Sequence, residues 1–159
     1  MTDTDRRLTA LETRLQAAED EIAIIRLVAS YGPLVDSGSV DHAPALFAPN
    51  GVYDINIGRM TGPRAIADML GGAGHQDLLT KGIAHVMGLP WVRLDGDTAV
   101  AVNCTRLYMC DAAGYSLFRV AQNVWKLQRQ TDRTWAVVER TNRLIGDDHA
   151  ARDLLHNAL

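Results

Sequence analysis

Apolar residues recur at intervals of three and four at the start of the chain, which is the spacing of an amphipathic helix. The pattern predicts a helix from about Asp5 to Val35. Its apolar stripe consists of Leu8, Leu11, Leu15, Ala18, Ile22, Ile25 and Ala29. Charged residues, Asp20 among them, occupy the opposite positions and predict a solvated face.

Pro33 interrupts this pattern near its end. It has no backbone N–H, and in a regular helix its ring collides with the carbonyl of Ala29. We therefore expect the helix to kink or end near Tyr31, with Asp36 at or just past its end. A regular helix turns about 100° per residue, so Tyr31 and Asp36 would point about 140° apart. A break at Pro33 would let both side chains face one cavity.

Short elements follow, separated by turn residues. Residues 40–47 are typical of a second helix, 49–51 of a turn, and 52–57 with 59–61 of a small hairpin around Gly58. A further helix is predicted over 64–70, because Pro63 suits a first turn. The glycine-rich stretch 71–74 lacks the Lys-Ser/Thr of a phosphate-binding loop, and we expect a mobile loop at a pocket mouth.

The remaining chain alternates between strand-like runs and tight turns. Strands are predicted over 82–94, 98–110, 115–130 and 134–145, and the tail 147–159 has helix composition. Helices followed by a long antiparallel sheet indicate an α+β fold. We expect a cone-shaped, curved antiparallel or mixed sheet wrapped around the N-terminal helices, with an internal pocket open at one end.

Composition agrees with a single globular domain spanning 1–159. The chain has 159 residues, 47% of them hydrophobic and 22% charged, with a net charge of -3. The charges are mixed, so neither nucleic acid nor an anionic membrane is an expected partner. No run is apolar enough for a membrane span or a signal peptide, which predicts a cytoplasmic location. Cys104 and Cys110 lie too far apart along one strand for a disulfide.

His85 is the first candidate for chemistry. Residues two apart in a strand share a face, which places His85 among apolar neighbours. Two interpretations are open: a core histidine satisfied by one hydrogen bond, or a general base whose second ring nitrogen is held by a carboxylate. Asp36 is our candidate for that carboxylate.

Arg140 is the charge on the more apolar face of the last predicted strand, together with Ala136, Val138 and Asn142. A buried arginine must be paired or must face a polar cavity. It therefore either forms a salt bridge with Asp36 or another acid, or stabilises negative charge that develops on a substrate.

Other polar and apolar residues complete the predicted pocket. Tyr31 can donate its phenol proton in a hydrogen bond to an oxyanion or can simply pack. Asn103 and Thr105 lie on an apolar strand face, where they either line a cavity or bind loop backbone. The predicted lining consists of Tyr53, Asn103, Thr105, Leu107 and Met87. We expect the three tryptophans, Trp91, Trp125 and Trp135, to belong to the core.

Several other chemistries are disfavoured. The sequence has no Gly-x-Ser-x-Gly, His-Glu-x-x-His or Cys-x-x-Cys motif. Its five histidines lack close metal-ligand spacing, so no metal site is expected.

The order of these residues resembles that of the NTF2-like, or SnoaL-like, superfamily over nearly the whole chain. Tyr31 and Asp36 follow a long first helix, Tyr53 lies on a short strand, His85 on the first long strand, and Arg140 on a last strand that starts with a tryptophan. Within the superfamily the chain is most similar to the branch of scytalone dehydratase, bile-acid 7α-dehydratase and hexachlorocyclohexane dehydrochlorinase.

The resemblance implies a pocket for an apolar, steroid- or polyketide-like molecule and an elimination without a cofactor. Asp36 would orient His85, His85 would be the base, and Tyr31 and Arg140 would assist the departing or charging oxygen. The same fold also supports isomerases, polyketide cyclases, hydrolases and non-catalytic binding or assembly modules, which stay as alternatives. Relatives form dimers or trimers, and a homo-oligomer is expected here.

Overall fold

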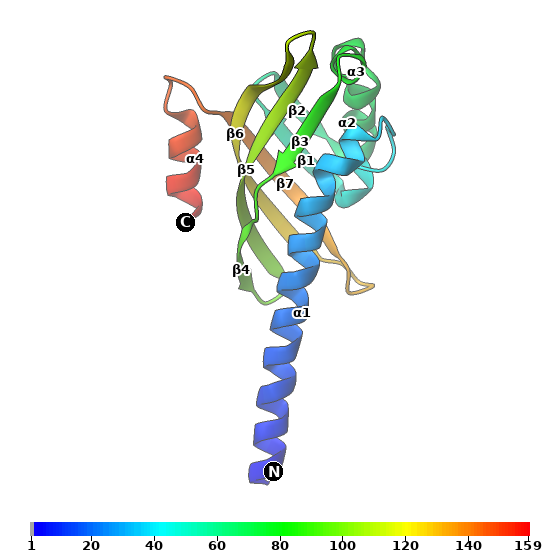
Figure 1. The fold of residues 1–159 in the computed structure, drawn as a ribbon. Coiled ribbons are helices and arrows are strands. Elements are labelled where there is room, and N and C mark those ends of the chain that lie inside the picture. The colour runs from blue at the N-terminus through cyan, green and yellow to red at the C-terminus, as the bar shows by residue number, and fades with distance from the viewer. Residues whose placement is uncertain (1) are drawn as a thin grey trace.

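A long helix, α1 (Asp3–Asp36), lies along one side of a curved sheet in the computed structural model, which describes residues 2–159 (Figure 1). Thr2 caps the helix, because its hydroxyl accepts the N–H of Asp5 while the Asp5 carboxylate accepts the N–H of Thr2. The N-terminal half of α1 extends beyond the sheet (Figure 1).

The helix does not end near Tyr31, because α1 continues through Pro33 to Asp36, which is its last residue as expected. Pro33 lies in the last turn, where one missing N–H disturbs little of the hydrogen-bond ladder. A hydrogen bond completes this last turn, because the N–H of Ser37 donates to the carbonyl of Pro33 at 3.0 Å.

Seven strands form one mixed sheet in the order β2-β1-β7-β6-β5-β3, and β4 pairs with β5 beside β3. All pairs are antiparallel except β1 with β7, which is parallel. The strands are β1 (Phe47–Ile55), β2 (Gly58–Thr61), β3 (Ile83–Met87), β4 (Trp91–Asp95), β5 (Thr98–Asp111), β6 (Gly114–Arg129) and β7 (Trp135–Leu144). The predicted α+β cone is confirmed.

Helices α2 (Gly62–Gly71) and α3 (Ala73–Thr80) cover the end of the cone where α1 ends, and α4 (Ala150–Ala158) packs on β6 on the other side of the sheet (Figure 1). The predicted mobile glycine loop is therefore wrong: Gly72 separates α2 from α3, and Gly74 lies inside α3. Helix 64–70 and the helical tail are confirmed.

Two other boundaries differ from the predictions. Only the 3-10 turn Pro44–Leu46 is helical within 40–47, and β1 runs through the predicted turn at 49–51 with a shift in its pairing to β7. The predicted strand 82–94 is divided at Gly88–Pro90, where Pro90 cannot donate to a ladder. Trp91, which begins the second piece, is 47% exposed, so its placement in the core was wrong.

The face of α1 that packs on the sheet carries Ile24, Val28, Tyr31 and Val35, all buried. The predicted stripe is therefore wrong as a core face: Leu8, Leu11, Leu15 and Ile22 are exposed. Asp20, predicted to be solvated, is buried instead. Its carboxylate accepts hydrogen bonds from Arg129 of β6 and from the indole of Trp135 of β7.

A β-bulge in β7 sets the direction of Arg140. Lys126 pairs with Glu139 and Leu127 with Val137, which leaves Val138 as an extra residue. A bulge reverses the alternation of faces, so Val137 and Arg140 both point inward. The predicted grouping of Arg140 with Ala136 and Val138 was wrong, although the inward direction was right.

Cys104 and Cys110 are free thiols, as predicted. Within residues 2–159, no helix combines the length and the apolar character that crossing a membrane requires.

Candidate functional site

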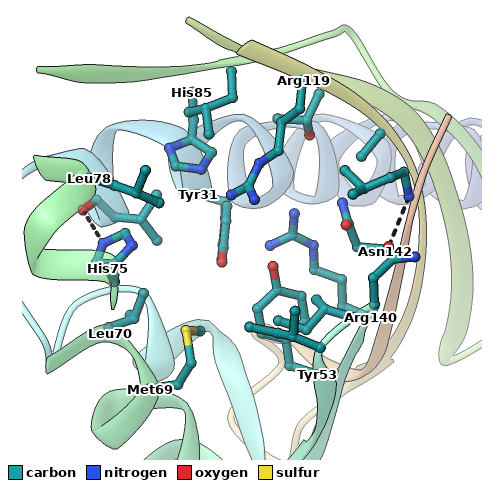
Figure 2. Close-up of a pocket in the computed structure, with 18 of the residues that line it drawn as sticks. Tyr31, Tyr53, Met69, Leu70, His75, Leu78, His85, Arg119, Arg140 and Asn142 are labelled. Atoms are coloured by element: carbon teal, nitrogen blue, oxygen red, sulfur yellow. Dashed lines mark hydrogen bonds between the residues drawn. The ribbon is translucent and has the colours of Figure 1, made fainter. Parts of the chain in front are cut away.

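A cavity of about 450 Å³ lies inside the cone, between α1, the helices α2 and α3, and the concave face of the sheet (Figure 2). This volume is within the range of small-molecule sites, about 300–1,000 Å³. The predicted residues Tyr31, Tyr53, His85, Thr105, Leu107 and Arg140 all line it. Much of the remaining wall is apolar, from Val35, Met69, Leu70, Leu78 and Leu144.

Asp36 lies behind His85 rather than on the cavity wall. Its Oδ2 accepts the backbone N–H of His85 at 2.6 Å, and its Oδ1 lies 2.6 Å from the ring Nδ1 of His85. The carboxylate thus binds the strand and the ring of the same residue. With Nδ1 engaged as the donor, Nε2 is the ring nitrogen left for a ligand.

One pair of residues near the end of α1 contacts His85, and another pair lines the cavity. Gly32 and Asp36 are four residues apart and both meet His85: a Cβ on Gly32 would lie 2.5 Å from the His85 carbonyl oxygen. Tyr31 and Val35, also four apart, line the cavity. A regular helix therefore serves both purposes, and the break that we expected at Pro33 is not needed.

The phenol oxygens of Tyr31 and Tyr53 both point into the cavity (Figure 2). The two rings meet edge to face, with centroids 6.1 Å apart and an interplanar angle of 70°. Burial raises the pKa of Tyr31 well above its usual range, and the neighbouring Tyr53 adds to the effect. Tyr31 is therefore a neutral hydrogen-bond donor at any physiological pH.

Arg140 is buried, at 1% exposure, in a cage of aromatic rings. Its guanidinium carbon lies 3.8 Å from the ring centre of Tyr31, 4.2 Å from that of Trp125 and 4.7 Å from that of Tyr53. Nε and Nη2 donate to the side-chain oxygen of Asn123 at 3.2 and 2.8 Å.

No carboxylate binds Arg140 within residues 2–159, so the predicted salt bridge with Asp36 or another acid is wrong. Its Nη1 is buried without a hydrogen-bond partner in this part of the chain. An unsatisfied cationic N–H costs free energy unless something else accepts it. Since Arg140 lines the cavity, an oxygen or anion of a ligand is a suitable acceptor.

Two predicted lining residues, Asn103 and Met87, are not on the cavity wall. Asn103 donates to the carbonyl of Gly88 at 3.0 Å and accepts from the indole of Trp125 at 2.9 Å, so it holds the loop between β3 and β4. Met87 packs against the core, and its sulfur accepts the hydroxyl of Thr105 at 3.4 Å. Strand parity predicted the correct face for both, but α1 covers that part of the sheet.

Four polar lining residues were missed: Asn56 between β1 and β2, His75 of α3, Arg119 of β6 and Asn142 of β7. Arg119 has the same strand parity as the buried Ala121, Asn123 and Trp125, and this signal would have found it. No local pattern pointed to His75, because the residues of α3 were taken as a loop. His75 lies close to Val35, with Nε2 3.5 Å from the Val35 carbonyl. Burial lowers the pKa of His75.

The polar side chains divide the cavity into two sides (Figure 2). His75 and His85 lie on one side, and Arg119, Arg140 and Asn142 lie on the other, with the Tyr31 phenol between them. An imidazole and a buried guanidinium thus face the same space. Within residues 2–159, no group of three or more His, Cys, Asp or Glu side chains is arranged to hold a metal ion.

The fold and this cavity define a cone-shaped α+β protein with an internal pocket of the size that small molecules occupy. Residues 16–141 match the model of the SnoaL-like domain, and the chain belongs to that family. A search of curated proteins gave no match.

Solved structures of similar fold agree with the family assignment. An NTF2-like protein with a cystatin-like fold from Novosphingobium aromaticivorans is 36% identical, with a TM-score of 0.89 over 93% of this chain and 96% of that one. Two others are similar in fold alone. Aln2 from a Streptomyces species is 16% identical, with a TM-score of 0.68 over 87% of this chain and 94% of that one. A Catenulispora acidiphila protein in complex with S-DNPA is also 16% identical, with a TM-score of 0.65 over 86% and 94%.

Proposed function

We propose that this protein is a cofactor-independent lyase or isomerase, of the dehydratase type, that acts on a small hydrophobic substrate. His85 is the general base, Asp36 orients it, and Tyr31 and Arg140 bind the oxygen that departs or becomes charged. The proposal places the chain near the dehydratases and dehydrochlorinase that its sequence resembles.

The observation that carries the proposal is the two-point contact between Asp36 and His85 beside an open cavity. A histidine that only filled the core would need one hydrogen bond and no free nitrogen at a cavity. Here the carboxylate fixes the tautomer with a proton on Nδ1, which leaves the lone pair of Nε2 for a substrate. The same carboxylate stabilises the imidazolium that forms after proton transfer.

In the proposed elimination of water, His85 both accepts the proton from the substrate and returns it to the leaving group. Nε2 of His85 takes a proton from the carbon next to the one that bears a hydroxyl. The C–H electron pair becomes the new C=C bond, and the C–O bond breaks. The leaving hydroxide takes the proton back from the imidazolium and departs as water. In an isomerisation the same proton returns to another carbon of the substrate.

Tyr31 and Arg140 have a different part from the base. The raised pKa of Tyr31 makes the phenol a hydrogen-bond donor to the departing oxygen rather than a source of its proton. The free Nη1 of Arg140, which is itself buried, offers a charge-assisted hydrogen bond to the same oxygen. The apolar walls, such as Met69, Leu70 and Leu78, suit the rest of a hydrophobic molecule.

A substrate screen with matched variants tests the proposal. Steroid, polyketide and terpenoid alcohols, ketones and halides are incubated with the protein in D₂O, and products are analysed by mass spectrometry. Loss of water or hydrogen halide indicates elimination, and deuterium incorporation without loss indicates isomerisation. We expect His85→Ala to lower turnover about 10²- to 10⁴-fold. His156→Ala, on the exposed face of α4, should leave it unchanged.

The rival is a non-catalytic binding module. It predicts that these compounds bind and raise the melting temperature but that none is turned over, and that Asp36→Asn leaves their affinity unchanged. Full turnover by a folded His85→Ala protein would refute the proposed mechanism.

A further inference from the structure

Part of α1 carries large apolar side chains that are about half exposed to solvent. Leu8, Leu11 and Leu15 are 55%, 57% and 60% exposed, and Ile22 is 48% exposed. Together with Ala18 and Ile25 they follow one another at steps of three, four, three, four and three. This is the a and d spacing of a coiled coil, with Leu8, Leu15 and Ile22 at a and Leu11, Ala18 and Ile25 at d. We call these six residues the α1 seam.

The domain packs against the opposite side of the helix. Gln16 binds Arg133, Asp20 binds Arg129 and Trp135, and Ile24 enters the core. At about 100° per residue, the mean direction of these three helix residues is roughly 170° from the mean direction of the seam. The seam therefore faces away from the domain, and its N-terminal part lies where α1 extends beyond the sheet (Figure 1).

The charged residues beside the seam favour pairing with a parallel copy of the same helix. In a parallel pair of helices, each g position faces the e position of the next heptad in the other chain. All three such pairs join opposite charges: Arg7 with Glu12, Arg14 with Glu19, and Glu21 with Arg26. Antiparallel helices place e against e, and two of the three e residues here, Glu12 and Glu19, carry the same charge. None of these six residues forms a salt bridge within residues 2–159.

We propose that a second copy of this chain packs along the α1 seam as a parallel, two-stranded coiled coil from about Thr4 to Ile25. At about 1.5 Å per residue the paired segment is roughly 33 Å long. Each cone lies on the outer side of its own helix, so the two cavities stay open. This interface is independent of the proposed chemistry.

Mass measurements on the full chain test the seam. We expect sedimentation velocity and light scattering to give the mass of two chains at micromolar concentration. Leu8→Glu with Leu15→Glu puts two carboxylates at a positions and should give the mass of one chain. Ala10→Glu with Ala17→Glu adds the same charges at the same spacing on an exposed face away from the seam, and should keep two.

Thermal unfolding shows whether each variant folds, since the core begins at Asp20, beyond the substituted positions. A monomeric wild-type chain, or a folded Leu8→Glu/Leu15→Glu protein with the wild-type mass, would overturn the proposal.

A disulfide tests the direction of the helices. Thr4 is at a d position, so in a parallel pair the two copies of Thr4→Cys approach within disulfide reach. We expect mild oxidation to give a covalent dimer, whereas the wild-type chain, with only Cys104 and Cys110, should give none. A non-covalent dimer that Thr4→Cys does not cross-link would rule out the parallel arrangement.

Discussion

Asp36 binds His85 through both of its carboxylate oxygens, one on the backbone N–H and one on the ring, each at 2.6 Å. The end of α1 and the strand β3 are therefore joined at the residue that we propose as the base. Any change that moves the helix relative to the strand also changes the orientation of the imidazole.

Replacing Asp36 with asparagine should separate the two contacts. An amide has one acceptor oxygen, so either the N–H or Nδ1 of His85 loses its acceptor, at a cost of about 1–3 kcal/mol in the free energy of unfolding. The proton on Nδ1 is then no longer fixed, and we expect turnover to fall about 10²-fold or more. Nitrogen-15 NMR of the ring reads the tautomer without a substrate. An unchanged tautomer in Asp36→Asn would contradict the role of the carboxylate.

Gly32 permits the close approach of α1 to β3. A Cβ at this position would lie 2.5 Å from the carbonyl oxygen of His85 and 3.2 Å from a side-chain carbon of Met87. Gly32→Ala should therefore push the helix from the strand, with a loss of about 1–3 kcal/mol in the free energy of unfolding.

Gly74 provides the matched control, because a Cβ there would meet nothing within 4 Å and the residue lies in α3. Gly74→Ala should be neutral or stabilising by about 0.5–1 kcal/mol. Urea unfolding of both variants, with the NMR of His85, checks the pair. Equal stability of the two variants would show that the contact at Gly32 is relieved without cost.

The sequence predicted the fold class and the direction of several site residues, because strand parity and turn residues are local signals. His85, Leu107 and Thr105 were placed on the cavity face by alternation alone, and Arg119 shares that signal with Ala121. Alternation fails where a strand changes register. The bulge at Val138 puts Arg140 on the face of Val137 instead of that of Ala136 and Val138, and no residue type in β7 predicts it.

The helix shows a second limit. The regular apolar stripe of α1 was taken for the core face, but the core is made by Ile24, Val28, Tyr31 and Val35. Periodicity identifies an apolar face without saying what covers it. Asp20 marked the true contact face, and its partners Arg129 and Trp135 are more than a hundred residues away in the chain. Such long-range partners have no local signal.

His75 should make the stability of the protein depend on pH. Burial, followed by the charges of His85 and Arg119, lowers its pKa, while its contact with the Val35 carbonyl and the charge of Asp36 oppose this. Its pKa is therefore below the ordinary value of 6.5 in the folded state, and the unfolded chain binds more protons below that pH. The stability due to neutral His75 is complete above pH 6.5 and is lost as the pH falls through the lowered pKa.

His75→Gln keeps a donor for the Val35 carbonyl and does not titrate, so its stability should fall less between pH 7.5 and pH 5.5. The difference between the two proteins cannot exceed about 1.4 kcal/mol per pH unit for one proton, and partial exposure makes it smaller. Urea unfolding at both pH values measures it. Parallel pH profiles would show that His75 titrates normally.

Substitutions of Arg140 should affect the stability of the protein and its turnover in opposite orders. Methionine has a similar length and no charge, and Asn123 keeps a hydrogen bond from Asn142 at 2.8 Å when Arg140 is removed. Replacing a buried charge with an apolar side chain is often neutral or stabilising, so Arg140→Met should change the free energy of unfolding by less than about 1.5 kcal/mol. Arg140→Lys keeps the charge but loses the planar stacking on Tyr31 and Trp125, and should be less stable than Arg140→Met.

Turnover should follow the opposite order, because lysine still offers a positive charge to the substrate oxygen and methionine does not. Denaturant unfolding and steady-state kinetics on the same three proteins test this reversal, and a loss of more than about 3 kcal/mol in Arg140→Met would instead make Arg140 a structural residue of the core.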